Sequence, residues 1–215
     1  MSNDLKIIVV GPTGSGKTEL VDILSSASKG FQGNRQPTVG LRILEFPITL
    51  EVNNLQTGIS VQLWDMSGDE RYSSCWPAVA KDADGCMLVY SANDRRQAQD
   101  LERYSREFTK NLNASQCLIV AHKMGAIEDK VPKPKLSANI QDAKIVPCNA
   151  QDINDSFTQQ FSAFLGQVQV AKKKAMEEAE QKMFGEAQNA PKPKKLPKIS
   201  DTKALLDDQE APPAQ

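Results

Sequence analysis

The chain has 215 residues, enough for one ordinary domain with an appendage and too few for two full-sized domains. It carries 26 Lys and Arg against 27 Asp and Glu, so it lacks the basic excess typical of proteins that bind nucleic acid or anionic membranes. No apolar run approaches the roughly 20 residues that cross a bilayer, and residues 1–4 lack the start of a secretory signal. We therefore expect a cytoplasmic protein with reduced cysteines and no nucleic-acid partner.

Short apolar runs alternate with segments of helical periodicity up to about residue 170. The runs predict buried strands of a parallel sheet at residues 5–10, 86–90, 117–121 and 144–146. Alternating strands and helices predict an α/β fold with a doubly wound, mostly parallel sheet.

The remaining elements complete this prediction. Apolar side chains at helical spacing over residues 98–112 and 153–168 predict two helices that cover the sheet. Residues 42–52 and 58–64 are extended tracts joined by turn formers, and they predict an antiparallel hairpin at the sheet edge. Residues 123–144 include two prolines and no apolar period, so a helix there is expected to be short, shifted or lost.

The composition changes after residue 170. Residues 171–184 are charged with a weak apolar stripe, which is typical of a helix that runs on past a globular body. From Gly185 the chain is rich in proline and poor in large apolar side chains, so it cannot offset the entropy of ordering. We predict a domain over residues 1–170, a helical extension over 171–184 and a disordered tail over 185–215.

A phosphate-binding loop follows the first predicted strand. Residues 11–18, GPTGSGKT, match G-x-x-x-x-G-K-[ST] between a strand and a helical run. Its glycines allow backbone N–H groups to surround phosphate oxygens, Lys17 can reach the β- and γ-phosphates, and the Thr18 hydroxyl can ligate Mg²⁺. The candidate nucleotide-binding residues of this loop are Gly11, Thr13, Gly14, Ser15, Gly16, Lys17 and Thr18.

Two further motifs point to a GTPase among the proteins with such a loop. Thr38 lies about twenty residues after Lys17, immediately before the predicted hairpin, where its hydroxyl could reach Mg²⁺. After the second hairpin strand, Asp65 could hold a metal-bound water and the Gly68 N–H could meet a γ-phosphate. The predicted metal site therefore consists of Thr18, Thr38 and, through water, Asp65.

In this order and spacing the motifs resemble the Ras superfamily of small GTPases, and its Rab-like branch in particular, over about residues 5–170. The stretches PTVGLRILEF (37–46) and LWDMSGDERYSSCWPAVAKDADG (63–85) are similar, more narrowly, to the GTPase-like subunits of intraflagellar transport complex B. The resemblance implies the small-GTPase fold, with six strands and one antiparallel edge strand, and GTP or GDP with Mg²⁺ as cofactors. It also implies a place in the cilium or flagellum and its base, and docking to the coiled-coil heterodimer of the complex B core.

The chain departs from this family at two motifs. The residue after the DxxG glycine is usually a glutamine that orients the attacking water, and here it is Asp69, so we predict slow or absent hydrolysis and assign no catalytic residue. The guanine-recognition motif N-K-x-D is replaced by residues 122–125, HKMG, in which Gly125 stands for the aspartate that binds the base. This change predicts atypical base recognition.

Other residues of the base site are carried over by resemblance. Lys123 can pack its stem on a base face, Asn149 and Ala150 stand where the family has its S-A loop, and Phe31 matches an aromatic that stacks on the base. Phe31 could equally anchor a loop. His122 could contact the base or be a satisfied residue at the end of a strand, and we favour the second role because a lone histidine is seldom functional.

The sequence leaves three functional hypotheses. The first is a GTP-binding subunit with little turnover whose nucleotide supports docking; the others are a cycling switch that needs an activating protein and a nucleotide-free scaffold. The intact phosphate loop disfavours the scaffold, and Asp69 disfavours the switch. Rab proteins usually end in prenylated cysteines, which are missing here, so we expect a monomer without a direct membrane anchor. The docking surface is expected around Thr38 and residues 69–76, where Trp76 is either an apolar anchor or a core residue.

Overall fold

The computed structural model describes residues 4–25, 36–52, 55–123, 131–149 and 155–188. Residues 1–175 form one compact unit, and the described part of the next unit is the helical stretch 176–188. The elements in chain order are β1 (Asp4–Val10), α1 (Lys17–Leu24), β2 (Leu41–Val52), β3 (Leu55–Met66), η1 (Glu70–Cys75), α2 (Trp76–Ala80), β4 (Gly85–Ser91), α3 (Arg95–Phe108), η2 (Ala114–Gln116), β5 (Cys117–Lys123), η3 (Ala138–Ile140), β6 (Lys144–Asn149) and α4 (Asp155–Gln188).

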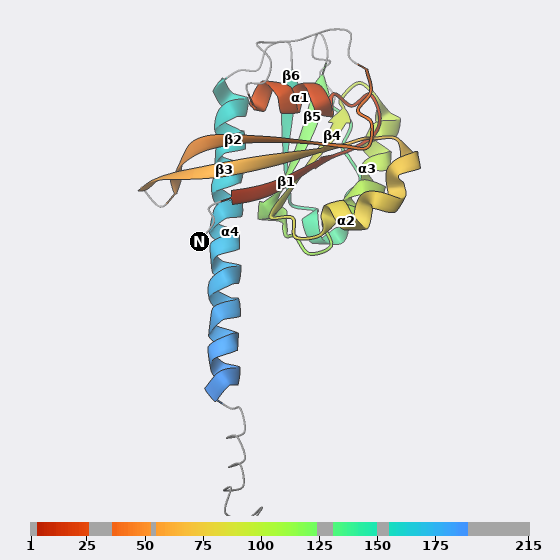
Figure 1. Ribbon diagram of the computed structural model, residues 1–215. Helices are drawn as coiled ribbons and strands as arrows, with labels where there is room; N and C mark the ends of the chain where they lie inside the picture. Colours follow the sequence, from red (N-terminus) through yellow and green to blue (C-terminus); the bar gives the residue numbers. More distant parts are fainter. Residues whose placement is uncertain (1–3, 26–35, 53–54, 124–130, 150–154, 189–215) are drawn as a thin grey trace, which may run out of the picture. The chain divides into compact units, whose positions relative to one another are not determined.

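The strands form a six-stranded sheet in the order β2-β3-β1-β4-β5-β6 (Figure 1). Among the described strands, only β2 pairs antiparallel, with β3; the pairs β1–β3, β1–β4, β4–β5 and β5–β6 are parallel. The predicted hairpin and the predicted α/β small-GTPase fold with one antiparallel edge strand are confirmed.

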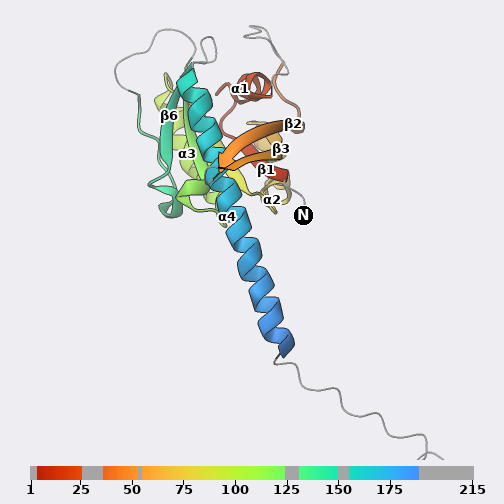
Figure 2. The same ribbon diagram turned by 90° about the vertical axis from the view of Figure 1, so that its left-hand side faces the viewer.

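Two apolar clusters lie on opposite faces of this sheet, because successive strand side chains point to opposite sides. On one face, Ile7 and Val9 of β1 pack with α1 and with the phenylalanines of α4. On the other face, Ile8 and Val10 pack with α2 and α3. Figures 1 and 2 show the resulting three layers, with α1 and α4 on one side and α2 and α3 on the other. Because β1 and β3 are parallel neighbours, their carboxyl ends lie side by side at the same end of the sheet.

The described part of the segment between β5 and β6 differs from the helix that the fold pattern predicts. This part, residues 131–143, contains only the short η3 turn. The chain instead runs along α3, where the Lys135 N–H donates to the Ala98 carbonyl at 3.0 Å and the Tyr90 hydroxyl donates to the Pro132 carbonyl at 2.9 Å. Proline lacks a backbone donor and disfavours helix in the residue before it, so Pro132 and Pro134 suit this extended path.

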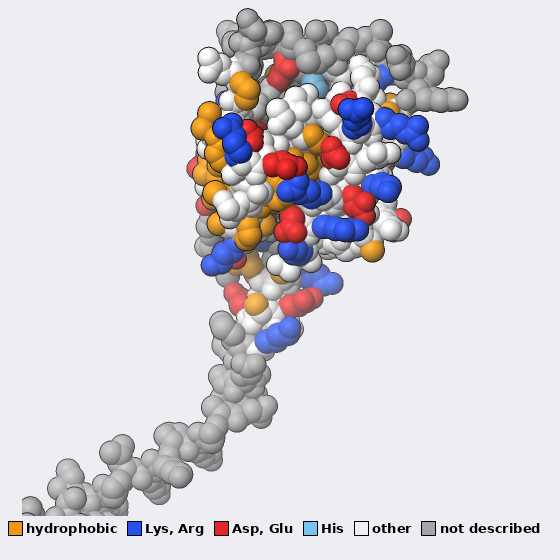
Figure 3. Space-filling model, turned by 90° about the vertical axis from the view of Figure 1, so that its right-hand side faces the viewer, with side chains coloured by type: hydrophobic (Ala, Val, Ile, Leu, Met, Phe, Trp, Pro, Cys, Tyr) orange, Lys and Arg blue, Asp and Glu red, His pale blue; other side chains and the backbone are white. Residues whose placement is uncertain are grey.

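Trp76 is a core residue. Its side chain is 3% exposed, and its ring lies 5.1 Å from that of Tyr104 and 5.3 Å from that of Phe108. The alternative of an exposed docking anchor is therefore wrong for Trp76. The surface over α3 is polar instead: Figure 3 shows basic and acidic side chains alternating there, as in the pair of Arg106 and Glu102 at 2.6 Å.

Besides the apolar contacts of its phenylalanines, α4 is bonded to the sheet region through Lys172. The Lys172 ammonium donates to the Asp4 carbonyl at 2.7 Å and to the Asp84 carboxylate at 2.8 Å. The helix continues to Gln188, and residues 189–215 lie outside the described part. The division into a domain, a helical extension and a tail stays a prediction. Among the described residues, no helix is long and apolar enough to span a membrane.

Candidate nucleotide-binding site

The loop between β1 and α1 is tightly enclosed. Gly16, just before α1, has φ of +87°, and a Cβ atom there would lie 2.3 Å from Nδ1 of His122 at the end of β5. Gly68 approaches from the other side, where a Cβ atom would lie 2.4 Å from the Thr13 backbone nitrogen. A side chain at either position would force the loops apart, which explains the glycines at both.

Lys17 is held inside this loop. It is 6% exposed, and its ammonium donates to the carbonyls of Gly11 and Pro12 at 2.8 Å each. Burial lowers the pKa of Lys17 to about 8, against the opposing effect of Asp65. The side chain is therefore still mostly protonated at neutral pH. It places a cation where the loop and the N-terminus of α1 already favour an anion.

Three oxygen-bearing side chains meet beside Lys17, as predicted for the metal site. The hydroxyls of Thr18 and Thr38 lie 2.6 Å apart, and the Thr38 hydroxyl donates to Oδ2 of Asp65 at 3.4 Å. Asp65 is fully buried, and its Oδ1 has no hydrogen-bond partner among the described residues. Burial raises the pKa of Asp65, while Thr18, Arg42, Lys17 and Thr38 oppose that rise. Two hydroxyls and an unsatisfied buried carboxylate oxygen are the hard oxygen donors that suit Mg²⁺.

Asp69 caps η1. Its Oδ1 accepts from the Arg71 backbone N–H at 2.9 Å, and its Oδ2 accepts from the Arg71 guanidinium at 2.9 Å and 2.7 Å. These contacts lower the pKa of Asp69, so it stays an ionised acceptor at neutral pH. An ionised carboxylate only accepts hydrogen bonds, so Asp69 cannot donate one as the amide group of the usual glutamine can.

A cavity of about 460 Å³ is bordered by Lys17, Thr18, Thr38 and Asp69. The residues that line it are Thr13, Gly14, Gly16, Lys17, Thr18, Glu19, Gln36, Pro37, Thr38, Val39, Met66, Ser67, Gly68, Asp69, Arg71 and Tyr72. The structure thus brings together most of the predicted phosphate and metal residues. Gly11, Ser15 and Asp65 lie outside this lining, and Ser15 and Asp65 are fully buried.

The predicted base site is only partly described. Lys123 and Asn149 are paired in register at the ends of β5 and β6, and neither lines the cavity. Phe31, Gly125 and Ala150 lie outside the described residues.

His122 is the last but one residue of β5 and lies beneath the phosphate-binding loop. It is 2% exposed and hydrogen-bonds to the Ser15 backbone, while its Nε2 is buried without a partner among the described residues. Burial lowers the pKa of His122 to about 4. Its position near the end of the strand agrees with the role that we favoured, but its Nε2, unpartnered in the described structure, does not fit a satisfied histidine, and its contact with the loop was not foreseen.

Sequence reasoning missed Arg42. Its guanidinium bonds to the Asp22 carboxylate at 2.8 Å and to Oδ2 of Asp65 at 3.3 Å. The only available signal was the hairpin register, which sets Arg42 directly opposite Asp65, and the sequence does not fix that register.

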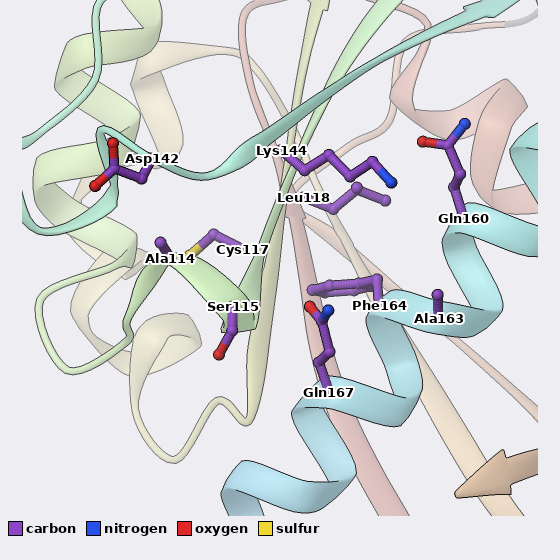
Figure 4. Close-up of a pocket in the computed structure, with 10 residues that line it drawn as sticks. All are labelled: Ala114, Ser115, Cys117, Leu118, Asp142, Lys144, Gln160, Ala163, Phe164 and Gln167. Atoms are coloured by element: carbon purple, nitrogen blue, oxygen red, sulfur yellow. The ribbon is translucent and has the colours of Figure 1, made fainter.

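A second hollow, of about 350 Å³, lies near the amino ends of the strands, away from the carboxyl ends that carry the candidate site (Figure 4). It is formed where β5 and β6 begin, and Figure 4 shows Lys144 extending above Leu118 toward Gln160 and Phe164 of α4. Ligands of parallel α/β sheets bind at the carboxyl ends of the strands. The hollow in Figure 4 is therefore separate from the nucleotide site.

Comparisons with known proteins agree with this geometry. Residues 6–125, more than half of the chain, match the model of Roc, the Ras of Complex domain of DAPkinase. The intraflagellar transport protein 22 homolog of Danio rerio is 30% identical over 167 residues, which cover 76% of this chain and 89% of the relative. The chain belongs to the intraflagellar transport protein 22 family of Ras-like GTPases.

Solved structures give the same family. The GTP-bound crystal structure of T. brucei IFT22/74/81 is 25% identical with a TM-score of 0.64, and the match covers 80% of this chain and 98% of that one. The GDP-bound crystal structure of T. brucei IFT22 is 26% identical with a TM-score of 0.59, over 79% and 98% of the two chains. The resemblance inferred from residues 37–46 and 63–85 is confirmed.

The buried His122 predicts a pH-dependent stability. The pKa of His122 falls from 6.5 in the unfolded chain to about 4 in the folded chain. Between these two pH values the unfolded chain binds more protons than the folded chain, so the folded state loses stability as the pH falls from 6.5 toward 4. We expect the wild type to lose about 2 kcal/mol between pH 7 and pH 5 from this group alone. Urea unfolding at both pH values measures the loss, and His122→Gln should reduce it by that amount. An equal loss in both proteins would contradict the prediction.

Proposed function

We propose that this chain binds GTP or GDP together with Mg²⁺ and acts as a subunit of intraflagellar transport complex B. The observation that carries the nucleotide proposal is that Lys17, Thr18 and Thr38 line one cavity, with the Thr38 hydroxyl donating to the buried Asp65 carboxylate. Lys17 and the loop amides would bind the phosphates, the two threonine hydroxyls would ligate Mg²⁺, and Asp65 would accept from a metal-bound water. Mg²⁺ would neutralise phosphate charge there.

Guanine is the base that we propose for this chain. The two T. brucei structures hold GTP and GDP, which supports a guanine nucleotide for this chain. Lys123, Asn149, Ala150 and Phe31 are the residues that we propose for the base. Gly125 cannot supply the carboxylate that usually binds guanine, so base recognition should depend more on stacking and backbone contacts.

Slow hydrolysis is the second part of the proposal. The Asp69 carboxylate is engaged by the Arg71 guanidinium, and an ionised carboxylate near the γ-phosphate repels negative charge. The Gly68 N–H remains available for γ-phosphate, so nucleotide sensing does not require turnover. Nucleotide would therefore support docking rather than drive a fast cycle.

The docking surface that we propose adjoins the nucleotide cavity. An apolar groove of about 270 Å³ is lined by Gly40, Leu41, Trp64, Met66, Tyr72, Cys75, Ala78 and Val79. Ile43 lies directly opposite Trp64 in the hairpin and is 49% exposed. Hydrophobic side chains also gather along one side of the face in Figure 3. Because T. brucei IFT22 was crystallised with IFT74/81, we propose the coiled-coil heterodimer of the complex B core as the partner, in the cilium or flagellum.

Removal of phosphate or metal contacts should abolish nucleotide retention. Lys17→Ala and Thr18→Asn should each lower GTP affinity by about a hundredfold or more, since each removes a charge-assisted contact. Chromatography of the denatured protein should show guanine nucleotide in the wild type and none in these variants. Lys144→Ala, in the hollow at the amino ends of the strands, is the matched control. Unchanged affinity of both variants in calorimetry would overturn the nucleotide site.

Hydrolysis should be limited by Asp69. The wild type should hydrolyse GTP no faster than about 10⁻³ s⁻¹ without a partner, and Asp69→Gln should raise this rate by up to about tenfold. Single-turnover assays with Mg²⁺ measure both. Asp69→Asn controls for the loss of charge, because its amide oxygen can still cap η1. A wild-type rate near one per second would refute slow turnover.

Docking can be tested with two exposed isoleucines on opposite edge strands. Ile43→Ser, beside the groove, should weaken binding of the coiled-coil heterodimer by about tenfold, because it removes an apolar contact. Ile145→Ser on β6, where the side chain is 41% exposed, should leave binding unchanged. Titration of the purified heterodimer measures both. Loss of binding in the control alone would move the docking surface to the other edge.

A further inference from the structure

Arg42 joins three elements at the candidate metal site. It stands in β2, directly opposite Asp65 of β3 in the hairpin register. One terminal nitrogen of its guanidinium lies 2.8 Å from the Asp22 carboxylate of α1, 3.3 Å from Oδ2 of Asp65 and 3.3 Å from the Thr18 carbonyl. It therefore connects the helix that follows the phosphate loop, the strand that follows Thr38, and the strand that carries Asp65.

The two carboxylates that Arg42 contacts are both buried. The side chain of Asp65 is 0% exposed and that of Asp22 is 5% exposed. Charges so placed need a counterion, because burial strongly disfavours an unpaired charge. Lys17 directs its ammonium to the loop carbonyls of Gly11 and Pro12, which leaves Arg42 as the cation bonded to Asp65 in the described structure.

We propose that Arg42 is a positioning residue that acts as a permanent counter-cation of Asp65 and thereby weakens the dependence of nucleotide binding on Mg²⁺. This inference rests on the proposed nucleotide function. The same Oδ2 atom of Asp65 accepts from Arg42 and from Thr38, whose hydroxyl is part of the candidate metal site.

Two consequences follow from this shared oxygen. Thr18 and Thr38, with Asp65 through water, would hold a dication beside a guanidinium that is already bonded to Asp65, and like charges would repel there. When Mg²⁺ is removed, Arg42 still neutralises Asp65 and Asp22, so less negative charge faces the phosphates. Nucleotide release should therefore respond weakly to chelation.

The test measures dissociation of a fluorescent guanine nucleotide from the full chain in Mg²⁺ and in EDTA. The readout is the ratio of the EDTA rate to the Mg²⁺ rate. We expect a small ratio in the wild type, a rise of at least about tenfold in Arg42→Gln, and a return toward the wild-type ratio in Arg42→Lys, which restores the charge. Arg106→Gln, in an exposed ion pair on α3, is the control and should leave the ratio unchanged.

A merely structural role gives a different result. Loss of packing would raise both rates together and leave the ratio unchanged, and that outcome overturns the inference.

A second measurement needs no bound nucleotide. Thermal unfolding of the nucleotide-free chain with Arg42→Gln, Asp65→Asn and both changes forms a double-mutant cycle. We expect Asp65→Asn to lower the unfolding temperature less, or to raise it more, in the Arg42→Gln variant than in the wild type. Additive effects overturn the counter-cation role. A wild-type chain that retains no guanine nucleotide instead overturns the proposed function, and the cycle still decides whether Arg42 and Asp65 are coupled.

Discussion

The buried carboxylate of Asp65 is the point on which the candidate site depends. It lies at the carboxyl end of β3 with no exposed surface, and burial of a charge is unfavourable unless partners surround it. Thr38 and Arg42 supply those partners from the chain that leads into and forms β2. The position of this one group therefore fixes the segment around Thr38 against the loop that carries Lys17.

The same segments link the nucleotide cavity to the apolar groove. Residues 38–43 run from the candidate metal site to Ile43, and residues 65–72 run from Asp65 to Tyr72 at the groove. The two segments are joined where the Ser67 N–H donates to the Gly40 carbonyl at 2.8 Å. If the groove is the docking surface, these two chain segments and the hydrogen bond between them would connect a nucleotide in the cavity to a partner in the groove.

The sequence predicted the parts of the fold that depend on local periodicity. Residues 5–10 and 117–121 are nearly continuous apolar runs, and such runs are typical of strands covered on both faces. The phosphate loop was also predictable, because its glycines, lysine and threonine serve chemistry that tolerates few alternatives. Positions that depend on distant neighbours were harder: Trp76 was left between core and surface, because only the packing of α2 on Tyr104 and Phe108 decides it.

By itself, the sequence determined the order of the strands along the chain, the phosphate-binding loop, and the replacements at Asp69 and Gly125, since these are properties of consecutive residues. Only the tertiary structure decided that residues 131–143 run extended along α3, that His122 lies beneath the phosphate loop, and that Arg42 contacts Asp65. The physical reason is the same in each case. Hydrogen bonds and ion pairs between residues far apart in the chain depend on strand register and helix placement, which the packing of the whole sheet sets.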